Sequence, residues 1–198
     1  MKRIYNKLFS VGSKGFTLIE LLVVIGILGI LASALIATID PFEQLKKATD
    51  AKIKNITVEF QTALVRYYTT HGTFPWNDIA SIENNTNPAC TALSSAVISG
   101  QKLSVAAVKA CIDNAGGASL IAEGELKSSF TSDVNDLAKV YVTWDPANAT
   151  NATICFSPTS KSQKGAPDTK WTDAQGATEG AACPSSTAAD NICFWCTQ

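Results

Sequence analysis

The sequence predicts an α+β protein in which a long N-terminal helix packs on a small antiparallel sheet. One apolar run of membrane length lies near the N-terminus and is continued by residues with helical spacing. Short aromatic and β-branched segments, typical of strands, begin only after residue 138. Six cysteines all follow the long helix, and this even number favours a disulfide-stapled head. The predicted fold is therefore a membrane-anchored helix that carries a compact α+β head.

The apolar run extends from Leu21 to Ile39 and holds 19 residues without a charge. As a helix it spans about 28 Å, close to the roughly 30 Å hydrocarbon core of a bilayer. Glu20 sits just inside the leading edge of the run. A lone carboxylate beside a membrane-length helix is costly, so its presence indicates a function.

The residues before the run form a basic leader, 1–15. This leader contains four of the 16 basic residues and none of the 17 acids, so the chain from Phe16 onward has a formal charge of −5. The asymmetry predicts a cytoplasmic N-terminus and an exported remainder. A secretory signal is cut after its apolar region, whereas here the small residue Gly15 precedes that region.

The junction reads Lys14-Gly15-Phe16-Thr17-Leu18-Ile19-Glu20 and continues as an apolar helix to Ala32. It resembles the type IV pilin family, including the pseudopilins of type II secretion, and a looser match reaches Trp76. The resemblance implies that a prepilin peptidase in the membrane cuts between Gly15 and Phe16 and methylates the new amine of Phe16. Both reactions are done to this chain, and no enzymatic activity of its own is expected.

Glu20 follows Phe16 by one helical turn and lies on the same helix face. In a filament the apolar helices would bundle, and a charge inside that bundle must be paired. We therefore expect Glu20 to neutralise the Phe16 ammonium of its own chain or of a neighbour. The alternative is an interfacial acid that lipid headgroups hydrate.

Three residues are candidates for a kink in the long helix. Gly26 and Gly29 either form a packing stripe between membrane helices or loosen the helix during assembly. Pilins often carry a proline 21 residues after the phenylalanine, a position that Ala37 occupies here. Pro41 follows one turn later and is expected to kink or break the helix near the outer membrane boundary.

Beyond Pro41, residues 41–71 are expected to form an amphipathic helix that ends at His71-Gly72. Its predicted buried stripe consists of Phe42, Leu45, Ala48, Ile53, Ile56, Phe60, Leu64 and Tyr67. The expected organisation is a leader (1–15), a transmembrane and filament-core helix (16–40), the amphipathic back half (41–71) and an extracytoplasmic α+β head (72–198).

Within the head, helical spacing predicts a helix over Lys102–Asn114 and a shorter one around Leu120–Ser128. Strand signals cover Lys139–Trp144, Ala152–Phe156, Asp168–Asp173 and Asn191–Cys196.

The six cysteines allow 15 disulfide pairings. Cys90 and Cys111 bracket the connector after the long helix, so we expect them to pair. For the others we favour Cys155 with Cys196, which would tie the chain's end to a strand, and Cys183 with Cys193. The Cys193-x-x-Cys196 spacing also allows a zinc or redox site. It lies in a strand-like segment rather than at a helix N-terminus, so no metal or cofactor is expected.

The sequence thus predicts a structural subunit that polymerises into a type IV pilus, a helical filament of identical chains. The expected partners are prepilin peptidase, a pilus or secretion assembly platform and, before assembly, the inner membrane, with the N-terminus inside. The assembled form would be extracellular. The alternatives are a pseudopilin of type II secretion or a monomeric membrane-tethered binding or redox protein. DNA binding through Lys161, Lys164 and Lys170 is a weaker hypothesis.

Overall fold

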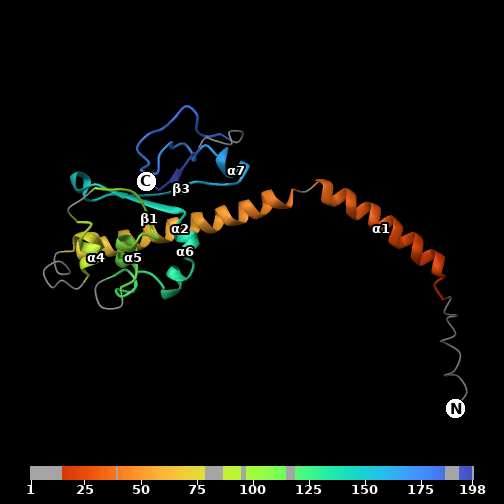
Figure 1. Cartoon of the computed structure of the whole chain (residues 1–198), viewed down its shortest axis with the longest axis horizontal. Helices are drawn as coiled ribbons and strands as arrows, with labels where there is room; N and C mark the ends of the chain where they lie inside the picture. The colour runs from red at the N-terminus through yellow and green to blue at the C-terminus, as the bar shows by residue number, and fades with distance from the viewer. Residues whose placement is uncertain are drawn as a thin grey trace, which may run out of the picture. The chain divides into compact units, whose positions relative to one another are not determined.

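The computed structural model describes residues 15–38, 40–78, 87–94, 97–114, 119–185 and 192–197. It comprises two compact units, Met1–Pro41 and Phe42–Gln198, which we describe separately (Figure 1). The leader expected at residues 1–15 lies outside the described residues except for Gly15.

The first unit contains one helix, α1 (Leu18–Thr38), among its described residues. Its stretch Leu18–Ile36 is long and apolar enough to cross a membrane. The helix runs through Gly26 and Gly29 without interruption. Its large apolar side chains are between 46% and 82% exposed. The other described residues of this unit therefore do not cover the helix.

Except for its first residue, α2 (Pro41–His71) belongs to the second unit. Helix α1 ends at Thr38, so the break in helical structure falls directly before Pro41 and not at the two glycines. Proline is tolerated as the first residue of a helix because the N–H that it lacks would have no partner there.

The predicted buried stripe of α2 is correct only for its later turns. Phe60, Leu64 and Tyr67 are fully buried, whereas Phe42 and Leu45 are 73% and 65% exposed. Apolar side chains of α2 become buried only from Ile53 onward, because the head contacts the first three turns only on the side that carries Glu43 and Asp50. The expectation of buried Phe42, Leu45 and Ala48 was therefore wrong.

A four-stranded antiparallel sheet packs on α2 in the order β1-β2-β3-β4 (Figure 1). The strands are β1 (Ile98–Lys102), β2 (Val140–Trp144), β3 (Ala152–Phe156) and β4 (Trp195–Cys196). Strands β2 and β3 match the predicted segments, and β4 covers only the end of the segment predicted there. The α+β fold class is confirmed.

Two sheet predictions need correction. Residues 168–173 form no strand, although Trp171 makes isolated bridges to Glu179 and Phe194. Strand β1 was missed because its sequence, ISGQK, lacks β-branched alternation. The pairing of β1 with β2 is irregular between Ile98 and Gln101, where Gly100 adopts a φ of +57°.

Short helices surround the sheet. They are α4 (Pro88–Thr91), α5 (Ala106–Ile112), α6 (Val134–Leu137), α7 (Lys161–Lys164) and the 3-10 helices η1 (Pro75–Asn77), η2 (Ser128–Ser132) and η3 (Pro146–Asn148). Helix α5 is shorter than the predicted Lys102–Asn114. The helix predicted around Leu120–Ser128 was wrong, because residues 120–126 form turns.

The core lies between α2 and the sheet. Trp76 from η1 and Trp144 from β2 meet edge to face, with ring centroids 5.8 Å apart. The hydroxyl of Tyr67 donates to Asp78 at 2.7 Å. Burial and this hydrogen bond raise the pKa of Tyr67 above its ordinary value.

Candidate processing and assembly site

The first turn of α1 is closed by Thr17 and Glu20. The backbone N–H and the hydroxyl of Thr17 donate to Oε2 of Glu20 at 2.9 and 2.7 Å. The N–H of Glu20 donates back to the Thr17 hydroxyl at 3.3 Å. This reciprocal arrangement is a capping box, which satisfies amide groups that a helix start otherwise leaves unpaired.

The role of Thr17 was not anticipated from the sequence. The pattern Thr-x-x-Glu before an apolar run is a known signature of a capping box and could have revealed it. Of the two carboxylate oxygens of Glu20, only Oε2 accepts a hydrogen bond from a described residue. Oε1 therefore remains available to a donor from outside the chain.

The expected cleavage bond, Gly15–Phe16, precedes α1 in a non-helical segment, and both residues are exposed. Phe16 and Glu20 line a shallow apolar hollow together with Ile19, Val23 and Val24. The Phe16 amine exists only after cleavage. Its pairing with Glu20 therefore stays a prediction.

All six cysteines form disulfides, with Cys90–Cys111, Cys155–Cys196 and Cys183–Cys193 as the pairs. These are the pairs that the sequence favoured. The two ends of the Cys193-x-x-Cys196 segment belong to different disulfides, so they do not form a redox pair. Within the described ranges, no cluster of three His, Cys, Asp or Glu residues could hold a metal ion.

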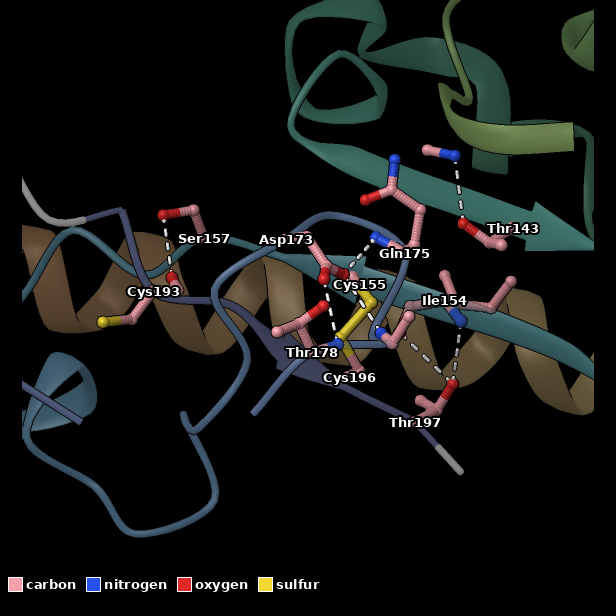
Figure 2. The surroundings of a disulfide bond; sticks show 12 residues. Thr143, Ile154, Cys155, Ser157, Asp173, Gln175, Thr178, Cys193, Cys196 and Thr197 are labelled. Carbon is pink, nitrogen blue, oxygen red and sulfur yellow. Dashed lines mark hydrogen bonds between the residues drawn. A yellow bond between two sulfur atoms is a disulfide. The ribbon is translucent and has the colours of Figure 1, made fainter. Parts of the chain in front are cut away.

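A loop over residues 173–178 covers the Cys155–Cys196 disulfide (Figure 2). The Asp173 carboxylate organises this loop by accepting the N–H groups of Gln175, Ala177 and Thr178 at 2.9–3.0 Å. Burial alone would raise the pKa of Asp173, but these hydrogen bonds outweigh burial and lower that pKa. No pattern in the sequence indicated this cover.

The other candidates have ordinary surroundings. His71 ends α2 and stacks on the ring of Tyr67, with centroids 4.0 Å apart. Lys170 forms an ion pair with Glu179, whereas Lys161 and Lys164 lie in α7. The three lysines of the DNA-binding hypothesis therefore do not share one environment.

Together, the apolar helix with its capping box and the disulfide-stapled head fit a protein that is anchored in the membrane through α1. Residues 12–36 match the family model described as the prokaryotic N-terminal methylation motif. This motif is the class III signal peptide of type IV pilins and pseudopilins, and it confirms the resemblance at the N-terminus. It points to a prepilin-like, non-enzymatic protein. Comparisons with curated proteins and with solved structures gave no match.

Proposed function

We propose that this chain is a structural subunit that prepilin peptidase cuts between Gly15 and Phe16 and that then polymerises into a type IV pilus. The observation that carries the proposal is the methylation motif at residues 12–36 followed directly by an uncovered apolar helix. Lipid can cover α1 before assembly, and the same helix of other copies can cover it afterwards.

A second surface supports self-association. Along the exposed face of α2, uncharged residues recur at alternating spacings of four and three and form what we call the outer stripe: Ala51, Asn55, Val58, Thr62, Val65 and Thr69. This spacing is typical of helices that pack on other helices.

The threonine hydroxyls of the outer stripe bond to the helix that carries them. The hydroxyls of Thr62 and Thr69 donate to backbone carbonyls of α2 itself, at 2.7 Å each. Their hydrogen-bonding groups are thus largely satisfied within the helix. The stripe therefore suits a second copy of this chain better than water.

Pseudopilins of type II secretion, whose fibres are short, carry the same motif. Fibre length in electron micrographs distinguishes a pilus subunit from a pseudopilin. A tethered redox enzyme is disfavoured because both cysteines of the C-x-x-C segment are bound to other partners.

The test is Glu20→Ala, with Glu59→Ala as a matched control on the exposed surface of α2. Glu20→Ala is expected to abolish or cripple filament formation while the head stays folded and the leader is still removed. Filaments are counted by electron microscopy, and the intact mass of the purified chain reports leader removal, one methyl group and three disulfides. Normal filaments from Glu20→Ala would contradict the proposal.

A further inference from the structure

We propose that the membrane-proximal end of the second unit binds the anionic headgroups of the membrane in which the unassembled chain is stored. The surface consists of Phe42, Leu45, Lys46 and Lys47 from the start of α2 and Lys161 and Lys164 from α7; we call it the lysine collar. This proposal depends on the membrane anchorage of the chain, which is part of the proposed function, and does not require polymerisation.

Two carboxylates of α2 assemble this surface from segments about 110 residues apart. Glu43 accepts the backbone N–H of Lys161 at 2.6 Å. Asp50, only 2% exposed, accepts the N–H and hydroxyl of Thr159 at 2.9 Å and the N–H of Ser160 at 2.7 Å. These bonds hold α7 beside the first turns of α2, as Figure 1 also shows.

The four amino groups of the collar differ from those of other lysines of the head. Among the described residues, Lys46, Lys47, Lys161 and Lys164 form no ion pair. Other lysines of the head do form them: Lys52 with Asp136, Lys54 with Asp168, Lys139 with Asp136 and Lys170 with Glu179. Of the acids at this end of α2, Glu43 and Asp50 accept backbone N–H groups of the α7 segment, and Asp40 precedes the helix, so the four lysines outnumber the three carboxylates.

The chain connection places this surface at the membrane. Only four residues lie between Ile36, the end of the membrane-length stretch, and Pro41, the start of α2. Even fully extended, the five steps from Ile36 to Pro41 reach at most about 18 Å. The chain connection therefore keeps the start of α2 within that distance of the end of the membrane-length stretch.

The chemistry of the collar fits an anionic lipid surface. Phe42 and Leu45 are strongly exposed and three residues apart, so they lie on one face of α2 next to Lys46. Apolar side chains can enter the headgroup boundary while lysine stems carry their ammonium groups to lipid phosphates. A nucleic acid would use the lysines but not the two apolar side chains.

The experiment places the full, unassembled chain in nanodiscs of phosphatidylcholine, with or without phosphatidylglycerol. Hydrogen–deuterium exchange is measured for peptides that cover residues 42–48 and 161–165. We expect slower exchange of both segments in the anionic discs and loss of this difference at high salt, because surface charges are screened. Each lysine removed is expected to weaken headgroup binding about fivefold.

The variant Lys161→Ala/Lys164→Ala should lose most of the lipid-dependent protection. The matched control Lys109→Ala/Lys127→Ala removes the same charge elsewhere on the head and should keep it. Equal exchange in both lipids, or equal loss in both variants, would overturn the proposal. Protection by a DNA oligonucleotide in discs without anionic lipid would assign the collar to nucleic acid instead. A failure of filament formation alters none of these readings, since every chain measured is unassembled.

Discussion

Hydrogen bonds and close packing of single residues hold several segments of the head in place. Asp50 is only 2% exposed and accepts hydrogen bonds from three donors of the segment before α7. Gly176 is equally specific, because its φ is +65° and it lies directly on the Cys155–Cys196 disulfide.

Gly176→Ala is expected to destabilise the head by about 1–3 kcal/mol. A Cβ there would lie 2.9 Å from Cγ2 of Thr153 and 3.0 Å from Sγ of Cys196, so the covering loop must shift. Thermal unfolding and the rate of disulfide reduction, followed by mass spectrometry, measure the effect.

The control for this variant is Gly124→Ala. Gly124 has a similar φ of +76° but open space around the added Cβ. It therefore reports the cost of backbone conformation alone. Equal effects of the two substitutions would show that the cover on the disulfide does not depend on close packing.

Elements of the head are connected by charges as well as by the core. Helix α2 contacts α6 through Lys52, which forms ion pairs with Asp133 and with the buried Asp136. The hydrogen bond from Lys52 lowers the pKa of Asp136 and raises that of Lys52. The outer stripe lies on the side of α2 opposite the buried Phe60 and Leu64, so one helix serves both the fold and the proposed assembly.

The Asp136 contact predicts a pH dependence. The folded-state pKa of Asp136 lies below its ordinary value of 3.8, so its contribution to stability is present above about pH 4. That contribution is lost as the pH falls through the folded-state pKa. Asp136→Asn should therefore be less stable than wild type at neutral pH, with a difference that shrinks in acid. Unfolding temperatures measured from pH 7 to pH 2 check this, and a constant difference would contradict it.

If the outer stripe is an assembly surface, a substitution in it should impair filament formation without impairing the folding of the head. Val65→Glu places a charge on a side chain that is 51% exposed, so the head should fold normally. Filament yield should fall strongly, because a buried unpaired carboxylate is costly in a helix interface. Electron microscopy and circular dichroism provide the two measurements.

Val134→Glu is the control for Val65→Glu. Val134 is 49% exposed and lies in α6, away from the outer stripe. It should leave both folding and filament yield unchanged. If both variants assembled equally well, the outer stripe would have no part in the filament.

At the scale of the whole molecule, three disulfides join the head into one unit. Cys155–Cys196 spans 41 residues and ties the last strand to β3, whereas Cys90–Cys111 and Cys183–Cys193 span 21 and 10. A longer closed loop restricts the unfolded chain more. The head thus depends on covalent links as well as on its buried core.

Removing each disulfide as a pair of alanines should destabilise the head by roughly 3–4 kcal/mol, in the order of loop length. Cys155→Ala/Cys196→Ala is expected to have the largest effect and Cys183→Ala/Cys193→Ala the smallest. Denaturant unfolding in detergent measures the three free energies. The reverse order would indicate that packing around each bridge, and not the closed loop, determines its effect.

Features that depend on neighbouring residues in the chain could be predicted from the sequence. The membrane-length helix, the Gly15–Phe16 junction and strands β2 and β3 all have local patterns of hydrophobicity or residue type. Even the expected disulfide pairs followed from the order of the strands and connectors.

Features that depend on distant partners emerged only from the tertiary structure. Strand β1 forms because β2 offers an edge with which to pair, and Asp50 is buried because a loop more than 100 residues away supplies its donors. Phe42 and Leu45 remain exposed because the sheet ends before it reaches them, although their spacing matches that of the buried residues. Local pattern determined which segments are helical, apolar or extended. Long-range contacts decided which of their faces the protein itself covers, since burial depends on what lies opposite a side chain and not on its neighbours in sequence.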